Sequence, residues 1–327
     1  MSTRSPESAQ TPDTRHLGLD LGGTNLKWAV VATGGGTWAT LATAQVPTRV
    51  VAEPEAVPAT IVGQLAEVAA AAIATWGPIA SIGIGVPGLY DPASGATRFL
   101  VNVPGPWAGQ PVAAPVAAAV GVPTFLINDA RAFGLAELRL GAGRGARSMV
   151  GITLGTGIGG VVVIDGRVIQ GHDGTAGEIG HQTIDPDGPL CGCGNRGCLE
   201  AHTRADRIAA ACGTATAEAA VAGARAGDAR AIAGLAEIGR LLGIGIANVI
   251  TILTPDRVVI GGGIAAASDV LFPSIRSELE RRVLVTALDK VELVAAELGT
   301  WAGAIGAAVH GAEACEAAAA PRPEDLA

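Results

Sequence analysis

The apolar residues near the start of the chain alternate with small or polar ones, and a pair of glycines interrupts the alternation. Residues 17–21 read LGLDL and residues 26–30 read LKWAV, with Gly22-Gly23 between them. A period of two places every second side chain on one face of a strand, so this stretch predicts two strands joined by a tight turn. Residues 149–164, MVGITLGTGIGGVVVI, repeat the pattern with a turn at 155–157. The two hairpins predict a duplicated domain plan.

The rest of the chain alternates between strand and helix patterns. Further strands are predicted at 79–86, 124–127, 167–169, 256–260 and 291–294, and helices at 57–75, 112–120, 130–140, 204–212, 217–226, 228–248, 268–283 and 301–313. Strands that alternate with helices are typical of an α/β fold. Residues 1–15 and residues 314–327 are expected to form loose tails.

Composition and charge narrow the classes of function. A chain of 327 residues suits two domains or one large one, and its net charge of −8 argues against a nucleic-acid-binding surface. Glycines and charges interrupt every apolar run before the ~18 residues of a membrane span, although the mean hydropathy is +0.41. Residues 1–15 lack the apolar stretch of a signal peptide, and the clustered cysteines indicate a reducing cytoplasm.

A glycine- and proline-rich stretch, residues 174–202, holds three of the five cysteines. Cys191, Cys193 and Cys198 have the spacing C-x-C-x4-C, and His181 is the nearest histidine upstream. Three thiolates and one imidazole are a standard closed zinc site, which would fix a loop that has few apolar residues. A chance cluster of reduced cysteines is the alternative, and a redox pair is disfavoured because the motif is not C-x-x-C.

Two carboxylates flank the cysteine loop. Glu178 lies three residues before His181, and Glu200 lies two residues after Cys198. A metal that fixes the loop would also fix both carboxylates, which are good acceptors for the several hydroxyl groups of a sugar. The alternative is that both glutamates are solvated surface residues.

The glycine turns and one strand end are candidates for phosphate chemistry. Backbone N–H groups of a glycine turn can hold phosphate, and Asp20 at the strand end is placed to hold hydrated Mg²⁺. A triple glycine, residues 261–263, follows a predicted strand and would let a nucleotide base approach the backbone. Asn128-Asp129 follows another strand, where Asp129 is either a catalytic carboxylate or the N-cap of the next helix.

Taken together, these segments resemble the ROK family of sugar kinases, within the actin-like ATPase superfamily. The matching segments are Asp20–Thr24, Asn128-Asp129, Gly155–Gly159, Ala176–His181, Cys191–Glu200 and Gly261–Gly263. The resemblance implies two ribonuclease-H-like α/β domains around a central cleft. Residues 16–127, completed by the helix at 301–313, would form the N-terminal domain, and residues 128–300 with the zinc loop 181–198 the larger C-terminal domain.

The resemblance also implies a role for each matching residue. Asp129 would be the catalytic base. Sugar hydroxyls would be bound by Gly88, Asn102, Asn128, Asp129, Glu178, His181 and Glu200. ATP and Mg²⁺ would be bound by Asp20, Gly22, Gly23, Thr24, Asn25, Gly155, Thr156, Gly157, Gly261, Gly262 and Gly263. A structural zinc ion would be bound by His181, Cys191, Cys193 and Cys198.

The implied activity is the ATP-dependent phosphorylation of the primary hydroxyl of a hexose, with glucose as the first choice. An amino or N-acetyl hexose or a sugar-like cyclitol is the next choice. Arg131, His202 and the segment 102–107 depart from the usual family pattern and are candidates for lining the sugar pocket. A homo-oligomer, dimer or tetramer, is expected in the cytoplasm. The alternatives are a polyphosphate-using kinase and a sugar-responsive regulator without catalysis, including a DNA-binding repressor.

Overall fold

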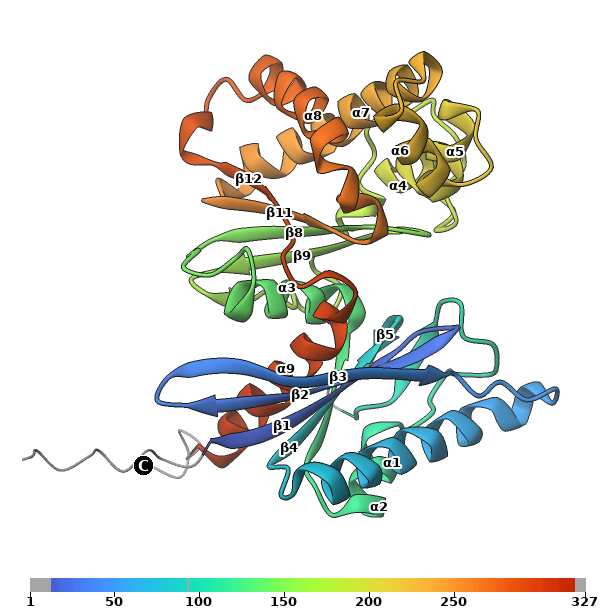
Figure 1. Cartoon of the computed structure of the whole chain (residues 1–327), viewed down its shortest axis with the longest axis vertical. Coiled ribbons are helices and arrows are strands. Elements are labelled where there is room, and N and C mark those ends of the chain that lie inside the picture. The colour runs from blue at the N-terminus through green and yellow to red at the C-terminus, as the bar shows by residue number, and fades with distance from the viewer. Residues whose placement is uncertain (1–12, 93, 321–327) are drawn as a thin grey trace, which may run out of the picture.

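Two five-stranded sheets organise the chain in the computed structural model, which describes residues 13–92 and 94–320 (Figure 1). The strands are β1 (Thr14–Leu21), β2 (Asn25–Gly34), β3 (Thr37–Pro47), β4 (Ser81–Val86), β5 (Gly88–Tyr90), β6 (Thr97–Leu100), β7 (Thr124–Asn128), β8 (Met149–Leu154), β9 (Ile158–Ile164), β10 (Arg167–Val168), β11 (Arg257–Gly261) and β12 (Glu292–Ala295). The helices are α1 (Val57–Trp76), α2 (Ala113–Val120), α3 (Asp129–Leu140), α4 (Leu199–Thr203), α5 (Ala205–Cys212), α6 (Ala217–Arg225), α7 (Ala229–Leu253), α8 (Ser268–Arg282) and α9 (Ala302–Ala319). Short 3-10 turns are η1 (Pro54–Ala56), η2 (Ile179–His181), η3 (Gly263–Ala267), η4 (Leu288–Lys290) and η5 (Gly299–Trp301).

The two sheets have the same topology, as the repeated hairpin pattern predicted. The N-terminal sheet has the strand order β3-β2-β1-β4-β7, and the C-terminal sheet has the order β10-β9-β8-β11-β12. In each sheet three antiparallel strands are followed by two parallel ones. The parallel strands of one sheet all end at the same edge, and that edge carries the segments on which the site depends.

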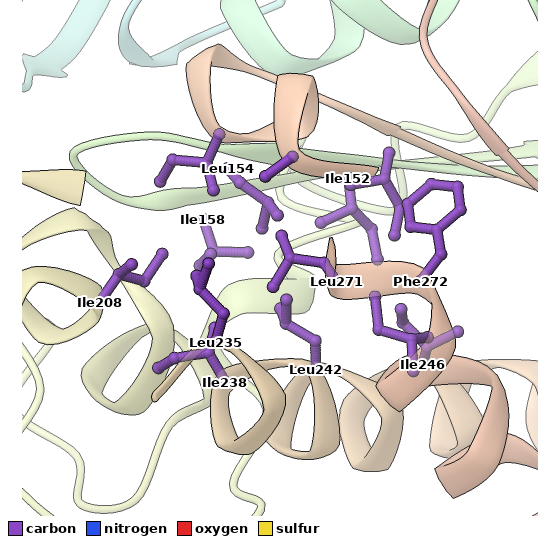
Figure 2. Packing of buried hydrophobic residues seen from close by; sticks show 14 of the residues in the cluster. Ile152, Leu154, Ile158, Ile208, Leu235, Ile238, Leu242, Ile246, Leu271 and Phe272 are labelled. Atoms are coloured by element: carbon purple, nitrogen blue, oxygen red, sulfur yellow. The ribbon is translucent and has the colours of Figure 1, made fainter. Parts of the chain in front are cut away.

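Helices cover both sheets and also lie between them. Helices α1 and α2 pack on the N-terminal sheet around a core that includes Leu17, Ile61 and Ile84. Helices α7 and α8 pack on the C-terminal sheet, where Ile152 and Leu271 lie in the close-packed layer shown in Figure 2. Helices α3 and α9 lie between the two sheets (Figure 1). These two helices therefore set how the two halves of the protein meet.

Several elements differ from the sequence predictions. Strands β3, β5 and β6 and helix α4 were not predicted, because their residues show neither a clear apolar alternation nor a long helical period. The N-terminal tail prediction is wrong for Thr14 and Arg15, which pair with β2, and residues 1–12 lie outside the described residues. The C-terminal tail prediction is wrong for residues 314–319, because their high alanine content continues α9 to Ala319. Residues 321–327 lie outside the described residues.

Two helices are long and apolar enough to cross a membrane, which the reading of apolar runs in the sequence did not indicate. They are α1 with its preceding turn, Pro54–Trp76, and α7, Ala229–Leu253. Both contribute buried side chains to the cores of the fold, for example Leu65 from α1 and Leu242 from α7. Their apolar character is therefore explained by packing against the sheets.

Helix α9 packs against its neighbours at distances that leave no room for a side chain. A Cβ atom added at Gly18 of β1 or Gly83 of β4 would lie 1.8 and 1.7 Å from carbonyl oxygens of α9. A Cβ atom added at Gly306 of α9 would lie 1.7 Å from the carbonyl oxygen of Ala132 in α3. Glycine at these positions lets the helix backbone touch the sheet and α3 directly.

The carboxylate of Glu137 joins the end of α3 to the segment that leads into α9. It is fully buried and accepts hydrogen bonds from the backbone N–H groups of Ala142, Glu297 and Leu298 at 2.8, 3.1 and 2.9 Å. A buried carboxylate is tolerated when such donors surround it. Glu137 therefore fixes the place where the chain crosses from the C-terminal sheet to α9.

Substitution of Gly83 tests the close packing of α9. We expect Gly83→Ala to lower the free energy of unfolding by about 3 kcal/mol or more, because the new methyl group overlaps the backbone of α9. Gly63 is the control, since it is exposed on α1 with no atom of the described residues within 4 Å of an added Cβ. Gly63→Ala should stabilise by about 0.5–1 kcal/mol. Urea denaturation measures both, and equal effects would contradict the packing argument.

Candidate active site

A cleft of about 670 Å³ lies between the two halves of the protein. Most of the predicted site residues line it, namely Asp20, Gly22, Gly23, Gly88, Asn102, Asn128, Asp129, Gly155, Thr156, Gly157, Glu178, His181, Glu200 and Gly262. Cys193 also faces the cleft, whereas Thr24, Asn25, Cys191, Cys198, Gly261 and Gly263 lie outside its lining. Residues from ten separate regions of the sequence thus meet at the edges where the parallel strands end.

The register of the N-terminal sheet brings the first carboxylates together. Asp20 of β1 is paired with Gly85 of β4, and Val86 of β4 is paired with Asn128 of β7. Because these strands are parallel, Asp20 near the end of β1 and Asp129 just after β7 lie at the same edge of the sheet. This arrangement explains why two acidic residues far apart in the sequence face one cleft.

Asp129 occupies the first turn of α3 and is held there by hydrogen bonds. Its Oδ1 accepts from the backbone N–H of Ala130 at 2.8 Å and from Nδ2 of Asn128 at 3.0 Å. Asn128 is the N-cap residue, because its Oδ1 accepts from the backbone N–H of Arg131. The N-cap alternative for Asp129 is therefore wrong. Both hydrogen bonds that Asp129 accepts from described residues end on Oδ1, so Oδ2 remains available in the cleft.

The electrostatic environment raises the pKa of the Asp129 carboxyl group to near neutral pH. Its pKa is raised to about 7, first because the carboxyl group is buried and second because the negative charge of Asp20 lies nearby. Glu178 raises the pKa further, and the hydrogen bond from Ala130 opposes the shift. Burial also raises the pKa of Asp20, against the positive charge of Lys27. A carboxylate with a pKa near 7 can accept and release a proton at neutral pH.

The two glycine turns face the cleft with tightly fixed backbones. The N–H of Gly22 donates to the carbonyl of Asn25 at 3.0 Å, and a Cβ at Gly23 would lie 2.3 Å from the carbonyl of Asn102. In the second turn the N–H of Gly155 donates to the carbonyl of Gly157 at 3.0 Å. Small residues at these turns leave the backbone open to a ligand in the cleft.

The triple glycine serves more than one purpose. Gly261 packs against Phe133, whose ring would lie 2.3 Å from an added Cβ, so this glycine makes room in the core. Gly262 lines the cleft with a φ of +89°, a backbone conformation that favours glycine. Gly263 has open space around it in the described residues. Of the three glycines, Gly262 is thus the one that lines the cleft.

The four predicted metal ligands meet in space. One ligand atom each from His181, Cys191, Cys193 and Cys198 lies within 4.8 Å of all the others. The sulfur of Cys191 is 3.6 Å from Nδ1 of His181, and the sulfurs of Cys193 and Cys198 are 3.7 Å apart. Zn–S bonds of ~2.3 Å and Zn–N bonds of ~2.0–2.1 Å in a tetrahedron require ligand separations of about 3.6 and 3.8 Å. The cluster therefore fits a tetrahedral metal ion.

The thiols of the cluster would have to lose their protons in order to bind a metal ion. Burial, then hydrogen bonding and charge from the neighbouring cysteines, raises the pKa of Cys198 to about 12. Burial raises the pKa of Cys191 as well, whereas the N–H of Asn195 lowers the pKa of Cys193. A bound metal ion releases these protons, so metal binding and the shape of the loop depend on each other.

Glu200 connects the metal loop to the second glycine turn. Its Oε2 accepts from the backbone N–H of Ile158 at 2.8 Å, and its Oε1 lies 3.8 Å from the sulfur of Cys191. A Cβ at Gly157 would lie 2.5 Å from the same carboxylate. Both glutamates line the cleft, where Glu200 is half-buried and Glu178 is exposed to solvent.

Sequence reasoning missed several residues of the cleft. Phe99 and Val101 line it from the hairpin region of β5 and β6, and half of the Phe99 side chain is exposed. Gly303 lines it at the start of α9, where an added Cβ would lie 2.5 Å from Oδ2 of Asp20. The repeated glycines of residues 299–306, GTWAGAIG, were the sequence signal for this close contact with Asp20. The β5–β6 hairpin carries no comparable sequence signal.

Two of the candidates for lining the sugar pocket lie outside the lining of the cleft. Arg131 is buried on α3 with 3% exposure and lies outside the cleft lining. His202 of α4 also lies outside the lining, with its buried Nε2 unpaired among the described residues. Of the three departures from the family pattern, only the segment 102–107 reaches the lining of this cleft, through Asn102.

Comparison with known proteins shows the class to which this fold and site belong. The ROK family profile matches residues 16–312, and the chain belongs to that family. The glucokinase of Halalkalibacterium halodurans is 33% identical over 317 residues, which cover 90% of this chain and 94% of that protein.

Solved structures agree with the family assignment. A ROK hexokinase from Thermus thermophilus has a TM-score of 0.79 and 34% identity, covering 93% of this chain and 100% of that one. A ROK family glucokinase from Streptomyces griseus, solved in complex with glucose and AMPPNP, has a TM-score of 0.74 and 30% identity, covering 91% and 99%. The predicted fold, two ribonuclease-H-like domains of the actin-like ATPase type, is confirmed.

Removal of one thiol tests the metal cluster. We expect Cys193→Ser to lower the bound metal from about one ion per chain towards none and the melting temperature by about 3 °C or more. Cys315→Ser is the control, because Cys315 lies on α9 outside the cluster. Elemental analysis and a thermal melt of both purified variants give the answer. Full metal content in Cys193→Ser would show that this residue is not a ligand.

Proposed function

We propose that this chain is an ATP-dependent kinase that phosphorylates the primary hydroxyl of a hexose, with glucose as its first substrate. The observation that carries the proposal is the position of Asp129, a carboxylate with a pKa of about 7 between two glycine turns. The likeness to glucokinases over 90% of the chain supports the same activity. An amino sugar, an N-acetyl hexose or a cyclitol is the alternative substrate.

In the proposed reaction Asp129 acts as the general base. Oδ2 of Asp129 accepts the proton of the primary hydroxyl, while the hydroxyl oxygen attacks the terminal phosphorus of ATP and ADP leaves. Phosphoryl transfer depends mainly on positioning and charge neutralisation, which the turns at 22–24 and 155–157 provide through backbone N–H groups. Asp20 would hold the Mg²⁺ that accompanies ATP and neutralises phosphate charge.

The remaining hydroxyls of the sugar would be held by the other side of the cleft. Glu178, Glu200 and His181 accept or donate hydrogen bonds there, and Asn102 and Asn128 complete the set. The metal would be zinc with a structural role, since four protein ligands leave no position for water or substrate. With Nδ1 of His181 directed at the cluster, Nε2 is the ring nitrogen available to the sugar.

The cellular setting follows from the same proposal. A metal bound by reduced thiols is suited to the cytoplasm, where the substrates ATP and sugar are dissolved. We also propose a homo-oligomer, a dimer or a tetramer. Gel filtration with light scattering measures the oligomeric state.

The activity is tested by measuring ADP release with a panel of hexoses, amino sugars and cyclitols. We expect glucose to give the highest kcat/KM, and Asp129→Asn to keep the affinities for sugar and ATP while kcat falls ~10²–10⁴-fold. Near wild-type turnover in Asp129→Asn would exclude it as the base. Sugar binding without any ADP release by the wild type would favour a non-catalytic sensor. Formation of sugar phosphate with polyphosphate but not with ATP would favour a polyphosphate-using kinase.

The pH dependence tests the assignment of the base. Below a pKa of about 7 the carboxyl group of Asp129 is protonated, so kcat/KM for the sugar at low ATP should fall about tenfold per pH unit. Glu178→Gln removes a negative charge that raises this pKa, so the acidic limb should move to lower pH. The same variant should raise the KM for sugar more than the KM for ATP. A limb that stays unshifted would mean that another group titrates.

A further inference from the structure

Arg131 is a buried cation that the proposed reaction leaves without a role. Its side chain is 3% exposed and lies behind residues 171–178, which we name the Glu178 loop. Burial of a guanidinium is unfavourable unless the group is paired and hydrogen-bonded. The negatively charged or polar groups around it belong to Tyr90, Glu178, Asp173 and Asp129.

The hydrogen bonds of Arg131 end on the Glu178 loop. Its Nη2 donates to the carbonyl of Gly174 and to the carbonyl of Ala176, the latter at 3.0 Å. Nε is buried and unpaired among the described residues. The orientation that directs Nη2 at the two carbonyls therefore leaves one buried donor without a hydrogen bond, which is unfavourable. A lysine could not donate from two fixed directions in the same way.

The Glu178 loop needs such an anchor. Gly171, Gly174 and Gly177 have φ values of +74°, +82° and +92°, which glycine adopts readily. Glycine also loses more conformational entropy than other residues when a chain folds, so ordering this loop is costly. Ala176 donates its N–H to the carbonyl of Gln170, the residue before this segment, at 3.1 Å. The backbone N–H and the hydroxyl of Thr175 donate to Oδ1 of Asp173, and the loop also rests on β9, where a Cβ at Gly160 would lie 2.2 Å from the carbonyl of Gly177.

The first turn of α3 is thereby tied to both sides of the cleft. Nδ2 of Asn128 donates to the carbonyl of Gly88 at 3.1 Å, on the N-terminal side. Arg131 binds the Glu178 loop on the C-terminal side, and Asp129 lies between these two contacts. One helical turn can therefore set the distance from the base to the carboxylate of Glu178.

We propose that Arg131 is a positioning residue that holds the carbonyls of Gly174 and Ala176 and so fixes the Glu178 loop beside Asp129. The effect on sugar binding rests on the proposed kinase function, whereas the effect on the loop does not. Arg131 itself touches neither sugar nor ATP. It acts through the loop that presents Glu178.

The test compares Arg131→Met, Arg131→Lys and the control Arg139→Met. Arg139 lies on the same helix and forms a partly exposed ion pair with Glu313. We expect Arg131→Met to speed amide exchange in residues 171–178 about tenfold or more and to raise the sugar KM about tenfold to a hundredfold, with the ATP KM unchanged. Arg131→Lys should change both quantities less and in the same direction, and Arg139→Met should change neither.

The two readouts separate the possible failures. Amide exchange of the loop is measured on the free protein, so it tests the anchor even if the wild type phosphorylates no sugar, an outcome that would overturn the proposed function alone. Unchanged exchange in Arg131→Met would overturn the anchor, as would equal increases in both KM values. If Arg131→Met does not fold, Arg131→Lys decides, and wild-type exchange and sugar KM in that variant overturn the proposal.

Discussion

Direct backbone contact between α9 and its neighbours is the constraint on which the site depends. At Gly18, Gly83 and Gly306 a side-chain carbon would overlap a carbonyl oxygen, so these positions fix α9 against β1, β4 and α3 with little freedom. Asp20 is the penultimate residue of β1, and α3 begins at Asp129. The separation of Asp20 and Asp129 therefore depends on these backbone contacts together with the pairing of β1, β4 and β7.

The C-terminal side of the cleft is fixed in a different way. There the ends of the loop from residue 178 to Glu200 join the core through Ile179 and Leu199, and the four-ligand cluster lies in the part between them. Glu200 then carries this order to the second glycine turn through its bond to Ile158. Loss of a metal ion bound by this cluster would consequently disturb Glu200 and, through it, the turn at residues 155–157.

The sequence predicted those features that depend on local pattern. The glycine hairpins, the metal ligands and the strand ends at Asp20 and Asn128 all carry short-range signals, and the structure brings them to one cleft. Contacts made across the sequence left no such signal. The contact of Arg131 with residues 174–176 depends on which face of α3 is turned toward that loop. The packing of Gly261 on Phe133 likewise depends on how α3 lies against β11.

The short strands β5 and β6 show a further limit of pattern reading. Their residues form a small antiparallel pair with an irregular register, between Leu89 and Tyr90, and part of the pair is exposed at the cleft. Such a pair has no continuous apolar face, so the alternation that identified the longer strands is missing. Roles of individual residues in the cleft likewise depend on chemistry that spacing does not encode.

The division into two sheets has an optical consequence. The chain has five tryptophans and one tyrosine, at Trp28, Trp38, Trp76, Trp107, Trp301 and Tyr90, and residues 149–295 contain none of them. All six absorbing side chains thus belong to the N-terminal half or to the turn before α9. Ultraviolet fluorescence of this protein therefore reports directly on that half, and it senses the C-terminal sheet through Trp38 and Trp301, which pack against the core cluster shared by the two sheets.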